Sequence, residues 1–422
     1  MSVVVQNSHG WFVDSCSLID QGYSRCIRWR GNKKSHVKCG FQRQCFQVQK
    51  HFGNDSDKAP VAGGRYTCGP SKKRPRKQNE LNQGEIDSQV FHEMIRSVIL
   101  EGTKSLVDSA QSLGYLKGEK DALKEPLPFQ ECNLAALCEM AKELPLVADE
   151  EQEECVQFLL AKDGCTSHVD LFSRVTENRE DWSAVVTLMG EEYVIPQHSA
   201  FLLSDFKQIQ PLIHYGRKFD LIVMDPPWQN KSVKRSRRYD FLPSSQLKGL
   251  PIPLLAAPNC LVVTWVTNRC SHQRCVRDEL YPHWGVEVIA EWFWVKVSTS
   301  GQFVFPLDSP HKKPYEVLVL GRYRPPSDTS KSSSEASEVL VEDHRLIVST
   351  PSVFHSQKPS LSEVLKPYVG AEAKCLELFA RSLQPRWTSW GNEVLKFQHT
   401  RYFTLTAADD PEDIAKEEEG TN

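Results

Sequence analysis

Residues 221–228 read LIVMDPPW, an apolar run followed at once by an acid, two prolines and a tryptophan. A short continuous apolar run is typical of a strand that is buried on both faces, as the strands of parallel sheets are. Open α/β sheets bind ligands beyond the carboxyl ends of such strands. We therefore expect an α/β sheet with a ligand site immediately after residue 224.

Comparable apolar runs recur through the second half of the chain, at 220–224, 261–266, 288–297, 316–320, 346–348 and 376–379. They predict an α/β domain over residues 186–405, because buried parallel strands have this texture. A segment rich in proline, serine and acids, 325–338, interrupts this domain and is predicted to be a surface insert.

The remaining regions show other patterns. Residues 1–84 are polar and lack sustained periodicity, so we expect most of them to be loosely ordered. Residues 85–185 are expected to form a helical accessory domain, since apolar residues recur there at helical spacing. The two apolar stripes are Phe91, Met94, Ile95, Val98 and Ile99, and then Leu134, Leu137, Cys138 and Ala141. The acidic residues 406–422 are expected to be a disordered tail.

Composition narrows the class of protein. The chain has 422 residues, a formal net charge of -3 and 13 cysteines. No run of about 18 apolar residues is present, which argues against residence in a membrane. The cysteines form no C-x-x-C pair and the start of the chain lacks an apolar signal-peptide core, so we expect reduced thiols in the nucleus or cytosol.

Basic residues cluster in two N-terminal stretches. Residues 72–77 contain a compact basic run that predicts a nuclear-import signal, with a solvated linker as the alternative. Residues 21–54 hold eight Lys or Arg and no acid. That stretch leaves a mitochondrial targeting sequence as a second, less favoured interpretation.

The tetrapeptide after the strand suits the exocyclic amine of a nucleic-acid base. Such an amine offers two N–H donors, which the carboxylate of Asp225 and the backbone carbonyl of Pro226 can accept. Pro226 and Pro227 make the turn rigid before substrate arrives, and Trp228 offers a stacking face for a base swung out of its strand. The alternative is a proline-stiffened loop without chemistry, which the position at a strand end disfavours.

Five basic residues follow the tetrapeptide within eight positions, Lys231, Lys234, Arg235, Arg237 and Arg238. They predict a clamp on nucleic-acid phosphates beside the base pocket, with a solvated basic loop as the alternative. The chain lacks G-x-G-x-x-G, the Walker phosphate loop and H-E-x-x-H. Nicotinamide, ATP and zinc-hydrolase chemistry therefore lose their usual motifs.

The stretch 225–228 resembles the signature of the messenger-RNA adenosine N6-methyltransferase family. Other stretches follow in that family's order, namely WVTNR at 265–269, WVK at 294–296, HSQKP at 355–359, ELFAR at 377–381 and residues 387–392. The resemblance implies a Rossmann-like sheet in permuted motif order, S-adenosylmethionine as cofactor, and methyl transfer to N6 of adenine. Such an in-line displacement requires no metal ion and no covalent nucleophile, and alignment of the reactants can supply about 7–11 kcal/mol.

The resemblance also implies a cofactor site. The matching residues are Asp205, Phe206, Asp225, Lys313, His355, Lys358, Arg381 and Asn392. Asp205 and Phe206 are expected at the adenine of the cofactor, and Lys313 at its methionine carboxylate. Arg381 and Asn392 are expected at the ribose and neighbouring atoms. Which group receives the proton after transfer, Asp225 or solvent, stays open at this point.

Two details of this site depend on local sequence. His355 and Lys358 precede a predicted helix, whose N-terminus favours a carboxylate or phosphate. Ser382 and Leu383 replace a His-Asn pair of the family's main catalytic subunit, and Glu393 stands in place of an amide. Ribose contacts are therefore expected to differ from that subunit.

Three functions compete. The favoured one is methylation of adenosine N6 in RNA, with small nuclear RNA and its 2′-O-methyladenosine in the implied substrate class. The second is the same chemistry on DNA, because the sequence does not separate the two sugars. The third is a non-catalytic nucleic-acid-binding subunit, which the intact set of site residues disfavours. The sequence requires no protein partner, and it does not give the target context, the oligomeric state or the role of the helical region.

Overall fold

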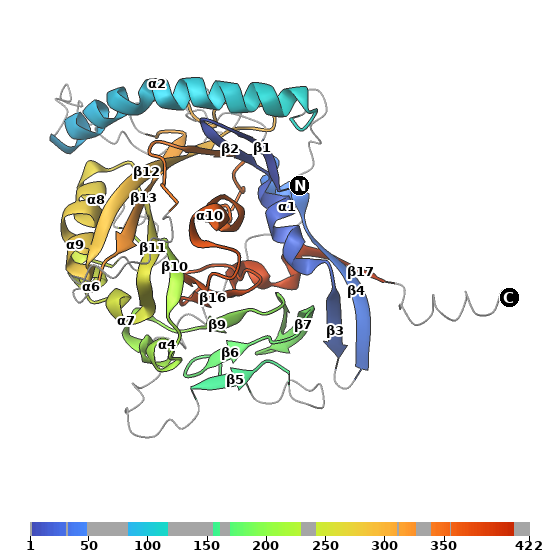
Figure 1. Ribbon diagram of the computed structural model, residues 1–422. Helices are drawn as coiled ribbons and strands as arrows, with labels where there is room; N and C mark the ends of the chain where they lie inside the picture. Colours follow the sequence, from blue (N-terminus) through green and yellow to red (C-terminus); the bar gives the residue numbers. More distant parts are fainter. Residues whose placement is uncertain are drawn as a thin grey trace, which may run out of the picture.

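The fold is described by a computed structural model of the chain (Figure 1). The described residues are 2–30, 33–48, 83–116, 155–160, 169–228, 242–309, 312–325, 339–354 and 356–408. Within them no helix combines the length and the apolar character that a membrane-spanning helix needs.

A twelve-stranded mixed sheet forms the centre of the molecule. Its spatial order is β1 (Val3–Asn7), β2 (Gly10–Val13), β14 (Leu346–Ser349), β12 (Val286–Lys296), β13 (Tyr315–Tyr323), β11 (Ala256–Val266), β10 (Phe219–Met224), β15 (Cys375–Leu378), β16 (Trp387–Trp390), β9 (Ala200–Leu202), β6 (Val175–Glu177) and β5 (Val156–Phe158). The six apolar runs seen in the sequence are β10 to β15. The expected α/β, Rossmann-like fold is confirmed.

Strand direction matters for the site. Strands β11, β10, β15, β16 and β9 pair in parallel, and so do β12, β14 and β2. Strand β13 is antiparallel to both β11 and β12, so it joins these two parallel groups. Eight carboxyl ends and the amino end of β13 therefore meet at one edge of the sheet.

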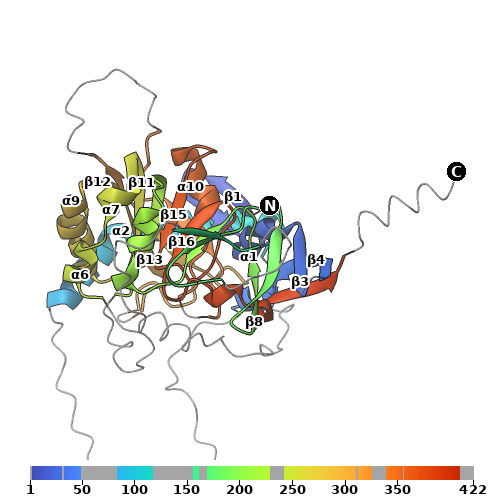
Figure 2. The same ribbon diagram turned by 90° about the horizontal axis from the view of Figure 1, so that it is seen from below.

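Helices cover both faces of the sheet. Ile222 and Met224 of β10 pack against α4 (Gln210–His214) and α7 (Ile252–Leu255), whereas Leu221 and Val223 face α10 (Ser362–Val369). Burial on both faces is why this strand is uniformly apolar. Helices α6 (Ser244–Lys248), α8 (Cys270–Arg274) and α9 (Tyr281–Trp284) lie at one end of the molecule, opposite β3 and β4 (Figure 1 and Figure 2).

The expectation that residues 1–84 are mostly loosely ordered is wrong for residues 2–48. Strand β2 pairs in parallel with β14, and β3 (Cys26–Arg30) pairs in parallel with β7 (Ser183–Leu188). A second, five-stranded sheet has the order β17 (Phe403–Ala407), β4 (Lys33–Phe41), β3, β7 and β8 (Glu191–Ile195). The pairs β2–β14, β3–β7 and β4–β17 join residues more than 150 positions apart, whereas β1–β2, β3–β4 and β7–β8 are local antiparallel pairs. The N-terminal strands were missed because residues 2–48 show no sustained alternation of apolar and polar residues.

The predicted helical accessory domain over 85–185 is also wrong as a unit. Helix α2 (Gln83–Ser112) is long and lies across β2, β12 and β14, with Ile95, Ile99 and Leu106 packed against Phe293 and Leu346. Later parts of that range are strands β5, β6 and β7 of the two sheets. Met94 of the predicted stripe is 66% exposed, because the buried face of α2 runs through His92 and Ile95 instead. The second predicted stripe, at 134–141, lies outside the described residues.

Two further predicted segments lie near the ends of described stretches. The predicted surface insert lies outside the described residues except for Pro325. The predicted disordered tail begins two residues too early, since β17 continues to Ala407, and residues 409–422 lie outside the described part of the chain.

Trp11 provides a test of the N-terminal strands. It is 3% exposed and packs on Trp292 with ring centroids 5.0 Å apart. Truncation in Trp11→Ala is expected to lower the free energy of unfolding by about 3–5 kcal/mol, because it leaves a large cavity. The measurement is urea denaturation followed by circular dichroism. Leu113→Ala is the control, since Leu113 is 67% exposed, and equal midpoints for the two variants would contradict an ordered N-terminal region.

Candidate active site

The predicted site residues gather at the edge where the strand ends meet. Asp225 follows β10, Arg381 follows β15, Asn392 follows β16, and Asp205 with Phe206 follows β9. These four strands are neighbours in the order β10, β15, β16, β9. Parallel pairing therefore brings together residues that are up to 187 positions apart, from Asp205 to Asn392. Lys313 reaches the same edge because β13 begins there.

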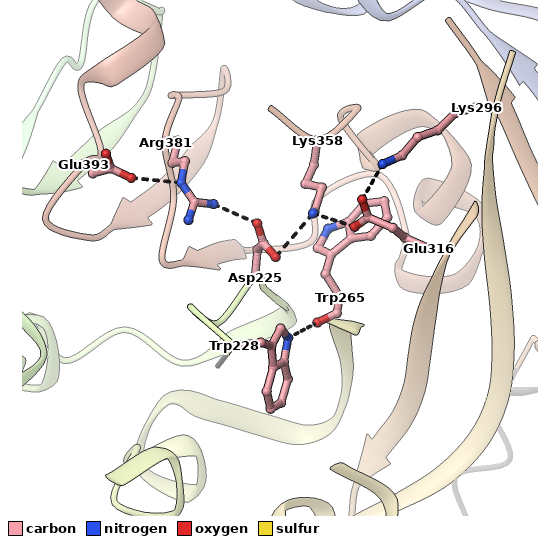
Figure 3. Close-up of polar contacts among 8 residues, drawn as sticks. All are labelled: Asp225, Trp228, Trp265, Lys296, Glu316, Lys358, Arg381 and Glu393. Carbon is pink, nitrogen blue, oxygen red and sulfur yellow. Dashed lines mark hydrogen bonds and ion pairs between the residues drawn. The ribbon is translucent and has the colours of Figure 1, made fainter. Parts of the chain in front are cut away.

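Asp225 is held between two cations (Figure 3). Arg381 donates from Nη1 to Oδ2 at 2.7 Å, and Nζ of Lys358 lies 3.5 Å from Oδ1. The three side chains are only 11–16% exposed. Each carboxylate oxygen therefore faces a different positive charge, which fixes the orientation of the carboxylate.

The ion pair is the centre of a longer chain of alternating charges. Glu316 accepts from Lys358 at 2.6 Å and also from Lys296. On the other side Glu393 accepts from Arg381 at 3.0 Å and from Lys396 at 3.1 Å. Lys296, Lys358, Arg381 and Lys396 thus alternate with Glu316, Asp225 and Glu393. The sequence predicted no role for Glu316, Lys296 or Lys396, because the residues with which they pair come close to them only in the folded protein.

The neighbouring opposite charges shift the pKa values of Glu316, Lys358 and Glu393. Burial alone would raise the pKa of Glu316, but the attraction of Lys296 and Lys358 outweighs it and lowers that pKa to about 2. Burial would likewise lower the pKa of Lys358, and the negative charges of Asp225 and Glu316 raise it instead. The pKa of Glu393 is lowered by Arg381 and Lys396 against the effect of burial. Glu316 and Glu393 are therefore held in the carboxylate form and Lys358 in the ammonium form at neutral pH.

Glu377 behaves differently from its neighbours. It lies on β15, and burial is the main reason that its pKa rises to about 7; the charge of Asp225 adds to this, against a 3.0 Å hydrogen bond from Gln384. The sequence predicted no role for this residue, although it lies within the stretch ELFAR. Its only sequence signal was an acid inside an apolar strand. A carboxyl group that titrates near neutrality beside Asp225 is a feature of active sites.

The turn after β10 is tighter than expected. The Pro226 carbonyl, predicted to accept from a base amine, already accepts a 2.8 Å hydrogen bond from the Trp228 backbone N–H. One lone pair of this oxygen stays available, because a carbonyl can accept twice. The Pro227 carbonyl accepts from Leu242 N–H at 3.2 Å. Both carbonyls therefore help to fix the turn.

Trp228 is more buried than a free stacking platform would be. It is 7% exposed, and its Nε1 donates to the Trp265 carbonyl at 2.8 Å. One ring face stacks on His272, with centroids 5.1 Å apart and planes 20° apart. Burial, together with Arg269, lowers the pKa of His272 to about 4, so a neutral imidazole covers this face. The predicted open stacking platform is therefore wrong, because Trp228 is part of a buried hydrophobic cluster and one ring face is already covered.

Lys313 is suited to bind an anionic ligand. Its Nζ atom is buried and has no hydrogen-bond partner among the described residues, and burial lowers its pKa. The charges of Asp308 and Glu93 oppose this lowering, but a buried ammonium without a hydrogen-bond partner is costly, which favours a negatively charged ligand at this point. The side-chain oxygen of Asn268 is likewise buried and without a partner within the described residues. Both atoms fit a ligand that brings a carboxylate and an ammonium group, as S-adenosylmethionine does.

Other predicted residues are less informative. Asp205 precedes a short 3₁₀ turn, η5 (Phe206–Gln208), and its side chain caps no backbone N–H there. Phe206 is partly buried against the core. His355 and the five predicted phosphate contacts at 231–238 lie outside the described residues. The predicted helix after Lys358 exists as α10, but its N-cap is Leu361 without a side-chain cap, and Lys358 contacts carboxylates.

Comparison with known proteins identifies the class. The MT-A70 family model matches residues 219–393. N(6)-adenine-specific methyltransferase METTL4 of Homo sapiens is 52% identical over 328 residues, which cover 76% of this chain and 69% of the relative. The chain therefore belongs to the MT-A70 family and is an adenine-N6 methyltransferase. This confirms the resemblance noted in the sequence, and it sets aside the non-catalytic subunit.

More distant relatives differ in the nucleic acid that their names give. N6-methyladenosine RNA methyltransferase MTA1 of Pyricularia oryzae is 32% identical over 229 residues, covering 52% of this chain and 58% of the relative. DNA N6-methyl methyltransferase of Caenorhabditis elegans is 36% identical over 220 residues, covering 51% of this chain and 56% of the relative. The shared chemistry is therefore methylation of adenine N6, with RNA in one relative and DNA in the other.

Glu377 predicts a pH dependence of stability. Its folded-state pKa of about 7 lies above its ordinary value of 4.5, so between these values the folded protein binds the extra proton. The free energy of unfolding contributed by this group therefore falls as pH rises through that window, by up to about 1.4 kcal/mol per pH unit. Glu377→Gln is expected to remove this slope. Urea midpoints at pH 5 and pH 8 measure it, and a variant as pH-sensitive as the wild type would contradict the assignment.

Proposed function

We propose that this methyltransferase transfers the methyl group of S-adenosylmethionine to N6 of adenosine in RNA, with 2′-O-methyladenosine of small nuclear RNA in its substrate class. The observation that carries the proposal is the orientation of Asp225 by Arg381 and Lys358 directly after β10. A carboxylate held in this way can accept from an exocyclic amine at a fixed place. The sequence stretches shared with the RNA methyltransferase family support RNA as the substrate.

Asp225 has two tasks in this proposal, to orient the amine and to polarise it. It accepts one N6–H, and the second lone pair of the Pro226 carbonyl accepts the other. Two accepted hydrogen bonds favour a more tetrahedral nitrogen whose lone pair points at the incoming carbon. Because Arg381 and Lys358 already hold the carboxylate, little reorganisation is needed when substrate binds.

The cofactor supplies an electrophilic methyl group on a sulfonium. Lys313 would hold its methionine carboxylate, since Nζ is buried and lacks a hydrogen-bond partner within the described residues. Asp205 and Phe206 would meet its adenine beyond β9, and Asn392 its ribose beyond β16. Arg381 donates hydrogen bonds to Asp225 and Glu393. It follows β15, which lies between β10 and β16 in the sheet. His355 and Lys358 complete the proposed cofactor set, with Lys358 acting through its contact with Asp225.

DNA remains the alternative substrate. It is favoured by one observation, the 36% identity to a relative named as a DNA N6-methyl methyltransferase. The described site residues would contact a base and a cofactor in either case, so they do not distinguish ribose from deoxyribose.

We also propose nuclear import through the basic run at 72–77, which lies outside the described residues.

Asp225→Asn tests the chemistry. The amide keeps the size of the side chain but loses the negative charge, so kcat is expected to fall by about 100-fold or more, as for loss of one preorganised electrostatic contact. The measurement is transfer from labelled S-adenosylmethionine to matched RNA, 2′-O-methylated RNA and DNA oligonucleotides, with N6-methyladenine identified by mass spectrometry. Asp220→Asn is the control, because Asp220 lies at the other end of the strand, where its carboxylate accepts the Lys374 N–H.

The oligonucleotide series also decides the substrate. Transfer to the RNA oligonucleotides that is lost in Asp225→Asn and kept in Asp220→Asn supports the proposal. Transfer to DNA alone would replace it with the DNA alternative. Full activity of Asp225→Asn on any oligonucleotide would contradict the role given to Asp225.

The basic residues 231, 234, 235, 237 and 238 give a separate prediction. Replacing all five by glutamine is expected to weaken RNA binding and to flatten its salt dependence, by about 0.7 in the log–log slope for each phosphate that is no longer neutralised. Fluorescence anisotropy between low and moderate salt measures this slope. Binding of S-adenosylmethionine by calorimetry is the control and is expected to be unchanged. An unaltered slope would show that these residues do not contact phosphates.

A further inference from the structure

Helix α2 makes a buried polar contact with the residues that flank Lys313. His92 on α2 is 0% exposed. Its Nδ1 lies 3.1 Å from the Tyr315 hydroxyl, and its Nε2 lies 3.1 Å from Oδ1 of Asp308. The rings of His92 and Tyr315 are also stacked, with centroids 5.9 Å apart and planes 9° apart. The two ring nitrogens of His92 therefore contact two residues, Asp308 and Tyr315, that are more than 200 positions away from it in the sequence.

The hydrogen-bond roles follow from the chemistry of the partners. The carboxylate of Asp308 only accepts, so Nε2 of His92 donates to it. In the neutral imidazole Nδ1 then accepts from the Tyr315 hydroxyl. Arg96, one turn further along α2, donates to both oxygens of Asp308 at 2.8 and 2.9 Å. Hydrogen bonds from Arg96 and His92 hold the pKa of Asp308 well below its ordinary value.

These contacts act at the beginning of β13. Asp308 lies five residues before Lys313, and Tyr315 lies two residues after it. Glu316 follows Tyr315 directly and belongs to the chain of charges that includes Asp225. The Tyr315 carbonyl also accepts from Asn268 at 2.6 Å. A helix that lies outside the family match at 219–393 therefore contacts residues on both sides of Lys313.

We propose that His92 is a positioning residue for the cofactor, acting through Asp308 and Tyr315 on Lys313. The inference rests on the proposed function, in which Lys313 binds the carboxylate of S-adenosylmethionine. It assigns to α2 the role of holding the cofactor lysine in place. His92 touches neither substrate nor cofactor, so its loss affects binding more than the chemical step.

Two variants test this role at different severity. His92→Phe keeps an aromatic ring and removes both hydrogen bonds, whereas Tyr315→Phe removes a single hydroxyl and is expected to fold normally. Each is expected to raise the KM and the Kd for S-adenosylmethionine, by about ten-fold for His92→Phe, the factor that corresponds to one hydrogen bond to a charged group. The value of kcat is expected to stay within about two-fold, because Asp225 and its partners are untouched. A fall in kcat with unchanged KM would overturn the inference.

Matched variants separate positioning from general loosening of α2. Asp308→Asn keeps an acceptor for His92 Nε2–H and is expected to bind the cofactor better than Asp308→Ala. Asp87→Asn is the control, because Asp87 ties α2 to Arg274 on α8 through an ion pair that does not involve His92, Asp308 or Tyr315. Its KM is expected to equal that of the wild type. A rise in KM for Asp87→Asn as large as that for His92→Phe would overturn the inference.

A double-mutant cycle with Lys313→Met gives the decisive measurement. If His92 acts through Lys313, His92→Phe adds little to the loss of cofactor affinity in the Lys313→Met background. The same fold loss in both backgrounds would overturn the inference while leaving the proposed function intact. Normal cofactor affinity of Lys313→Met would also overturn it, again without touching methyl transfer. A wild-type protein that binds no S-adenosylmethionine would instead refute the proposed function, and the inference with it.

Discussion

The burial of the Asp225 carboxylate at the end of β10 is the constraint on which the site depends. A charge that is 13% exposed needs opposite charges close by, and it finds them in Arg381 and Lys358. Those cations are equally buried, so Glu393 and Glu316 are needed in turn. The alternation ends at Lys296 and Lys396, which are 21% and 14% exposed. One buried acid is thus linked to six charged neighbours of alternating sign.

The sheet topology makes this alternation possible. Asp225, Arg381 and Glu393 follow three adjacent parallel strands, which deliver their side chains to one edge. Glu316 arrives from the opposite direction, because β13 is antiparallel to its neighbours and starts where they end. Lys358 comes from the segment after β14. A sheet of purely parallel strands would place Glu316 at the far edge, away from Lys358.

The parts outside the family match contribute to the same architecture. Strand β2 extends the main sheet beyond β14, and Trp11 packs on Trp292 of β12. Helix α2 covers these strands and reaches the start of β13 through His92. The N-terminal region is therefore built into the catalytic domain, and separating the two would expose the apolar faces of β12 and β14.

The sequence by itself determined the class of the protein and the centre of its site. The apolar runs predicted β10 to β15, because strands buried on both faces must be apolar, and residues 225–228 marked the strand end at which the candidate site lies. Only the tertiary structure decided the N-terminal strands, the place of α2, and the roles of Glu316 and Glu377. Residues 2–48 show no sustained alternation that would mark their strands, and the environment of a carboxylate is made by residues that the chain brings together only on folding.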